Sequence, residues 1–149
     1  MDSPAPKDLK SKKKAPSPRR DGREAAVQFL YGHEAQGGID TSEKSLEAFW
    51  SLRDAKPIVR EFAEELIRGV VSHADEIDSM IRTHLENYSL ARLEAVDRNI
   101  LRLGTYEVLF ANHIPPQAAI NEAIEIAKRF GSEESAGFIN GILDRILKR

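Results

Sequence analysis

The chain has 149 residues, which suits one domain of ordinary size with a hydrophobic core and leaves no room for two large domains. Hydrophobic residues make up 41% of it and charged residues 31%, as in a soluble globular protein. No apolar run approaches the roughly 18 residues that span a bilayer, and no apolar export segment follows the charged N-terminus. The absence of cysteine excludes disulfides, thiolate metal sites and cysteine nucleophiles. We therefore expect a cytoplasmic protein without a membrane anchor.

The net charge of −2 conceals a strong asymmetry between the two ends of the chain. Residues 1–23 carry a net charge of +5, whereas the remainder carries −7. Within this segment, residues 1–18 contain four prolines and almost no apolar side chain, so they cannot bury enough surface to offset the entropy of ordering. We expect a disordered basic arm that meets a polyanionic partner, with a merely solubilising tail as the alternative.

Apolar residues recur at helical spacing in the first half of the chain. The first predicted helix runs from Arg19 to the Gly37-Gly38 break. Asp40 or Thr41 is expected to cap a second helix that ends near residue 54. Proline at position 57 suits the first turn of a third helix, which continues to about residue 72 and should pack on the first. A fourth helix is expected over about residues 75–85.

The second half predicts three more helices. A broad apolar surface between Leu93 and Phe110 indicates a helix that is buried on several sides, either within one chain or between two copies in a homodimer. Two further helices follow over about 116–130 and 133–147, with Gly131 ending the first and Ser132 capping the second.

The predicted fold class is all-α, because no segment alternates with period two for long enough to form a strand. About seven helices are expected to form two packed sub-bundles, over about 19–86 and 87–149. Together they would make one helical domain behind the basic arm.

Catalysis has no positive support in the sequence. The four histidines include no pair at the i, i+4 spacing that places two imidazoles on one helical face. Glu122 and Glu125 share a face, but an exposed helical surface explains them more simply than paired catalytic carboxylates. No glycine-rich phosphate loop is present. We expect no catalytic residue, no metal ligand and no cofactor.

Three segments in order closely resemble one family, the NusB transcription antitermination factors. They are RRDGREAAVQFLYGHE at 19–34, ARLEAVDRNILRLGTYEVLF at 91–110, and IPPQAAINEAIEIAKRFGSEESAGFINGILDRI at 114–146. The resemblance implies a helical bundle that binds boxA RNA together with NusE, a small-subunit ribosomal protein. This complex would join the transcription elongation machinery on ribosomal RNA operons, with no bond made or broken. The alternative is a helical protein-interaction adaptor whose basic arm is only a tail.

Basic residues at the start of the chain are the first candidate RNA contacts. Arg19, Arg20 and Arg23, with Lys12, Lys13 and Lys14 upstream, could contact phosphates, and guanidinium planes can also stack on unpaired bases. Their alternative interpretation is a solvated helix start, which is disfavoured because cations there oppose the helix dipole.

The remaining candidates follow from family positions. Phe130, Glu134 and Phe138 match positions near the RNA, and Asp97 matches an acidic residue at the NusE surface. Tyr31 carries a hydroxyl suited to a partner contact. The alternatives are core packing for the two phenylalanines, dipole compensation for Glu134, an intrahelical pair for Asp97 and a boundary aromatic for Tyr31.

Overall fold

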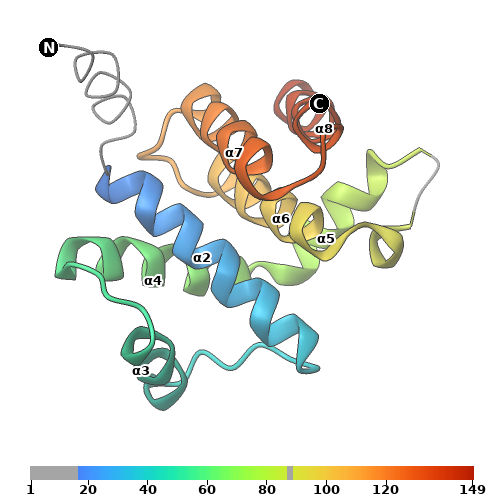
Figure 1. The fold of residues 1–149 in the computed structure, drawn as a ribbon. Coiled ribbons are helices and arrows are strands. Elements are labelled where there is room, and N and C mark those ends of the chain that lie inside the picture. The colour runs from blue at the N-terminus through green and yellow to red at the C-terminus, as the bar shows by residue number, and fades with distance from the viewer. Residues whose placement is uncertain (1–16, 87–88) are drawn as a thin grey trace, which may run out of the picture.

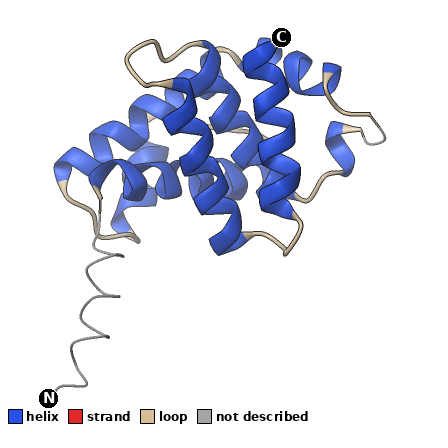
Figure 2. Ribbon diagram, turned by 90° about the horizontal axis from the view of Figure 1, so that it is seen from above, coloured by secondary structure: helices blue, strands red, loops and turns tan. Residues whose placement is uncertain are grey.

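The computed structural model describes residues 17–86 and 89–149, and within these ranges every regular element is helical (Figure 1). Figure 2 shows the same helices from above, joined by loops. This confirms the predicted all-α class of about seven helices. The elements are α2 (Pro18–Ala35), α3 (Glu43–Ser51), α4 (Pro57–Ser72), α5 (Ala74–Thr83), the 3-10 turn η1 (Leu90–Arg92), α6 (Ala95–Leu109), α7 (Pro116–Phe130) and α8 (Ser135–Lys148).

The first described helix starts earlier than expected. Ser17 is its N-cap, and the Ser17 hydroxyl accepts a hydrogen bond of 3.4 Å from the backbone N–H of Arg20. Pro18 opens the helix, because its missing N–H would have no partner in the first turn anyway. The expected arm over 1–18 is therefore too long by these two residues. The rest of it, with Lys12 to Lys14, lies outside the described residues, as does the predicted sub-bundle boundary at residue 87.

Two of the predicted helix caps are wrong. Ser42 caps α3 by accepting from the backbone N–H of Ser45 at 3.2 Å, whereas the side chain of Asp40 instead accepts from the N–H of Ser42. At α8 the cap position is Glu134, which makes no side-chain capping bond, and the backbone N–H of Ser132 donates to Ser135 Oγ. Sequence spacing placed both helices correctly but could not decide which of several polar residues would cap them.

The arrangement is built around α6. In Figure 1, α2 crosses in front of α4, and α7 and α8 lie on the other side of α6. Contacts join α6 to α2, α4, α5, α7 and α8, and α2 to α4, which confirms the predicted packing of the first helix on the third. Ile100, Leu101 and Leu103 of α6 are almost completely buried. The broad apolar surface of this helix is thus covered within one chain, and one continuous core extends from α2 to α8.

No helix among the described residues is both long enough and apolar enough to cross a membrane. Nor do those residues contain a group of three or more histidine, aspartate or glutamate side chains placed to hold a metal ion.

Candidate nucleic-acid interface

A pocket of about 550 Å³ lies between the start of α6 and the turn that joins α7 to α8. We call it the aromatic pocket. It brings together four residues that sequence analysis had singled out separately, namely Phe130, Glu134, Phe138 and Asp97. Its complete lining is Arg92, Leu93, Glu94, Val96, Asp97, Phe130, Gly131, Ser132, Glu134, Ser135 and Phe138.

The two phenylalanines of the aromatic pocket differ in burial. Phe130 ends α7 and is 40% exposed, so the core interpretation of this residue is wrong. Phe138 is partly buried on the first turns of α8 and packs against the hydrophobic core while it also lines the pocket. An exposed ring and a half-buried ring on facing sides of one turn offer flat surfaces on which unpaired bases can stack.

The turn between α7 and α8 is tightly packed. A Cβ added to Gly131 would lie 2.5 Å from Ser135 Oγ and 2.9 Å from the carbonyl oxygen of Ala127. The buried hydroxyl of Ser135 also accepts from the N–H of Ser132 at 2.9 Å. Glycine thus allows α7 to end and α8 to begin within a few residues, which fixes the separation of Phe130 and Phe138.

The opposite wall of the aromatic pocket is held by Arg98. Its Nη1 donates to the carbonyl oxygen of Leu93 at 2.7 Å and to that of Leu90 at 3.3 Å. These bonds tie the η1 turn to α6, and η1 carries Arg92 at its end. Arg92 is exposed and is the only cation in the described lining of this pocket.

Asp97 has an unusual environment for a carboxylate. The residue is only 8% exposed, and its Oδ1 is one of two buried side-chain oxygens that lack a hydrogen-bond partner within residues 17–86 and 89–149. The other is Thr105 Oγ1. No ion pair joins Asp97 to its helical neighbours in the described chain, which disfavours the intrahelical alternative. A buried acceptor without a donor is unfavourable unless a ligand supplies one.

The arginines at the start of α2 have three different environments. Arg23 is 4% exposed, and its guanidinium binds both carboxylate oxygens of Glu107 at 2.9 to 3.1 Å, within the core. A phosphate cannot reach it in this fold. The expectation that Arg23 contacts RNA is therefore corrected, and its role is to join α2 to α6.

Arg20 and Arg19 remain closer to the surface. Arg20 forms a two-point ion pair with Glu122 of α7, at 3.0 and 3.1 Å. The hydrogen bond from Arg20 lowers the pKa of the Glu122 carboxyl, and partial burial opposes this shift less strongly. Arg19 is exposed, and its guanidinium lies 5.1 Å from the ring centroid of Phe62. Of the three predicted arginines, only Arg19 is free of an acidic partner in the described chain.

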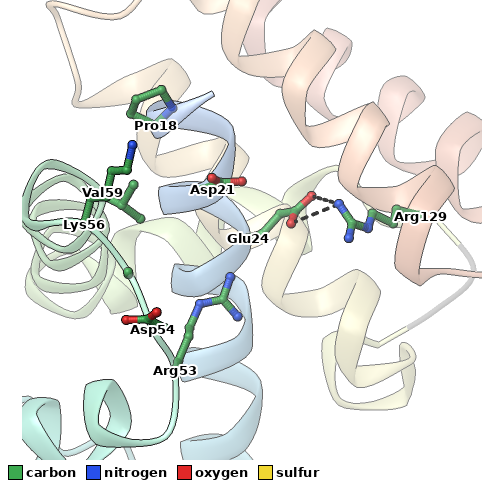
Figure 3. Close-up of a pocket in the computed structure, with 9 residues that line it drawn as sticks. Pro18, Asp21, Glu24, Arg53, Asp54, Lys56, Val59 and Arg129 are labelled. Atoms are coloured by element: carbon green, nitrogen blue, oxygen red, sulfur yellow. Dashed lines mark hydrogen bonds and ion pairs between the residues drawn. The ribbon is translucent and has the colours of Figure 1, made fainter. Parts of the chain in front are cut away.

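A second pocket, of about 560 Å³, lies between the start of α2, the α3–α4 loop and the end of α7. We call it the loop pocket. Figure 3 shows Arg53 and Lys56 on the loop and Arg129 on the opposite side, where it binds Glu24. The lining consists of Pro18, Asp21, Glu24, Arg53, Asp54, Ala55, Lys56, Val59 and Arg129.

Comparison with known proteins identifies the family of the chain. The NusB family model matches residues 20–148 of the chain. The chain belongs to the NusB family. Its relatives include the transcription antitermination protein NusB of Myxococcus xanthus, which is 45% identical over 132 residues and is aligned over 93% of its own length and 86% of this chain. The protein of the same name from Desulfitobacterium hafniense is 47% identical over 131 residues, which cover 87% of this chain and 88% of the relative.

Solved NusB structures share the fold. The T. maritima NusB structure has a TM-score of 0.78 at 44% identity, covering 89% of this chain and 92% of that one. A crystal structure of the antitermination factors NusB and NusE in complex with double-stranded RNA has a TM-score of 0.78 at 30% identity, covering 88% of this chain and 96% of that one.

Sequence reasoning missed an ion-pair network in this NusB family member. Glu34 at the end of α2 accepts from Arg98 at 2.8 and 2.9 Å and from Arg102 at 2.7 Å, and Arg102 also binds Asp78 of α5. Partial burial alone would raise the pKa of Glu34, but hydrogen bonds from Arg98, Arg102 and Asn99 lower it to about 2. The i, i+4 spacing of the two arginines was visible in the sequence, whereas their distant partners were not.

Tyr31 lies outside the lining of both pockets. It is 45% exposed on α2, and its predicted partner contact stays a prediction.

Proposed function

We propose that this NusB family protein binds boxA RNA of ribosomal RNA operons together with NusE and acts as a transcription antitermination factor. The observation that carries the proposal is the aromatic pocket, where Phe130, Phe138, Glu134 and Asp97 converge from two segments of the chain. The antitermination proteins of the same family, and the solved complex of NusB with NusE and RNA, support it.

The chemistry of the pocket suits unpaired bases. Phe130 and Phe138 offer stacking surfaces, while the carboxylates of Glu134 and Asp97 can accept hydrogen bonds from base amino groups. A base inside a duplex presents only its edges in the grooves, so stacking on Phe130 requires a single-stranded segment. We therefore infer that boxA is read as single-stranded RNA, with Arg19, Arg20 and the lysines at 12–14 supplying phosphate contacts.

Asp97 links the RNA to the second partner in this proposal. It lines the aromatic pocket, and the resemblance to the family implies that it also lies at the NusE surface. NusE bound at the α6 side would lie next to the RNA, so each ligand would strengthen the binding of the other. The assembly would then join the elongation complex in the cytoplasm, and the protein itself would make and break no bond.

Replacing Phe130 tests the proposal on one exposed side chain. Loss of one stacked base costs about 1–3 kcal/mol, so Phe130→Ala should weaken boxA binding at least about fivefold. Leu52→Ala is the matched control, because Leu52 is also exposed, at 91%, and lines neither pocket. If both variants keep their helical circular dichroism and both bind boxA RNA as tightly as the wild-type protein, the aromatic pocket is excluded as the RNA site.

The adaptor alternative makes a different prediction. It expects NusE to bind with the same affinity whether or not RNA is present. Titrating NusE in both conditions separates the two functions.

A further inference from the structure

The loop pocket borders the aromatic pocket through two consecutive residues at the end of α7. Arg129 lines the loop pocket and Phe130 lines the aromatic pocket. The guanidinium of Arg129 lies 5.2 Å from the centroid of the Phe130 ring, so the two side chains form one continuous surface. A strand with a base on Phe130 would therefore lie beside Arg129 at the edge of the loop pocket.

The cations of the loop pocket come from the α3–α4 loop and from the end of α7, and they are only partly neutralised. Arg129 binds Glu24, which is 6% exposed and faces the pocket (Figure 3). Arg53 donates to the uncharged side chain of Gln28, and Lys56 is exposed. Neither Arg53 nor Lys56 forms an ion pair within the described residues, so both are available to an anion.

Acidic residues in the same pocket limit what it can bind. Asp21 and Asp54 line it together with the cations, so a simple anion would gain little from the pocket as a whole. A nucleotide offers both kinds of partner. Its phosphate can bind Arg53 and Lys56, and the amino group of its base can donate to a carboxylate.

We propose that an RNA strand bound in the aromatic pocket continues across Phe130 and Arg129 into the loop pocket, where Arg53 and Lys56 contact its phosphates. This inference rests on the proposed function and extends it, because it makes the α3–α4 loop part of the RNA path. Pro18, the first residue of α2, also lines the loop pocket, so the pocket includes the start of that helix.

The experiment compares a short boxA RNA with RNAs extended by several nucleotides at either end, using fluorescence anisotropy with NusE present. The test variant is Arg53→Ala/Lys56→Ala. The control variant, Lys44→Ala/Lys148→Ala, removes the same charge from residues that line neither pocket. Each phosphate contact on a single strand contributes about 0.7 to the salt slope, so two contacts contribute about 1.4. Between about 50 and 200 mM salt, wild-type affinity for the extended RNA should therefore fall about sevenfold more than that of the test variant.

The outcomes separate this inference from the proposed function. A loss of affinity that is confined to the test variant and to one of the extended RNAs supports an RNA path through the loop pocket. Unchanged binding of every RNA by the test variant overturns it, as does an equal loss for short and extended RNA. A change in NusE binding alone would assign the loop to a protein contact and also overturn it. If the wild-type protein does not prefer boxA RNA over a scrambled strand, the proposed function itself fails.

Discussion

Replacing Arg23 should lower the free energy of unfolding of the protein by a large amount, and this effect does not involve RNA. The side chains of Arg23 and Glu107 are 5% and 1% exposed, and their carboxylate–guanidinium contact is made through three short hydrogen bonds. Arg23→Ala leaves a buried carboxylate without its partner, which typically costs about 3–5 kcal/mol. With a urea slope of about 2 kcal/mol per molar, the midpoint of unfolding should fall by about 1.5–2.5 M.

Urea denaturation followed by circular dichroism measures this shift directly. The matched double variant Arg23→Met/Glu107→Leu removes both charges and keeps apolar volume, so it should recover most of the lost stability. A midpoint for Arg23→Ala within about 0.3 M of wild type would show that the Arg23–Glu107 ion pair does not support the fold, since a slope of about 2 kcal/mol per molar then allows a change of only about 0.6 kcal/mol. In that case Arg23 would return to the set of available RNA contacts.

Three further predictions concern other parts of the fold. The folded-state pKa of Glu34 lies below its usual value, so its contribution to stability is present above about pH 4.5 and is lost as the pH falls through about 2. Glu34→Gln should therefore have a lower urea midpoint than wild type at pH 7, and the two midpoints should converge near pH 2; a constant gap would contradict this. Gly69→Ala places a Cβ 2.1 Å from the Tyr106 ring and should cost about 1–3 kcal/mol in urea denaturation, whereas Gly32→Ala meets nothing within 4 Å and should be neutral or stabilising. If both variants unfold at the same midpoint, the close packing of α4 on α6 is wrong. Asp97→Asn should leave thermal stability unchanged or raised, because the lost charge had no donor at Oδ1, and should weaken binding of RNA or NusE. A thermal loss without any change in binding would make Asp97 structural.

The helices were predictable because local signals determine them. Apolar spacing located the seven α-helices that lie within residues 17–86 and 89–149, and proline at position 57 marks the start of α4 as expected. The caps of α3 and α8 were not predictable, since neighbouring polar residues compete for the same backbone N–H groups and tertiary packing decides between them. Gly131 ends α7, as predicted, and its tight contact with Ser135 supplies the reason.

Long-range pairing explains the errors at the site. Arg23 was predicted to contact RNA because of its charge. It shares the helical face of Ala26 and Leu30, however, and that spacing indicates burial. Its partner Glu107 is 84 residues away, so no local pattern could reveal the ion pair. The aromatic pocket has the same origin: its two walls, which carry Asp97 and Phe130, come together only when α6 packs against α7 and α8.

Recognition of boxA RNA by this protein together with NusE can be measured in a ternary titration. Fluorescently labelled single-stranded boxA RNA is titrated with the protein at moderate salt, with and without NusE, beside a scrambled strand of the same length. We expect the protein to bind boxA RNA more tightly than the scrambled strand, and we expect NusE to strengthen RNA binding by the same factor by which RNA strengthens NusE binding. Equal affinity for boxA and scrambled RNA in the presence of NusE would contradict this expectation.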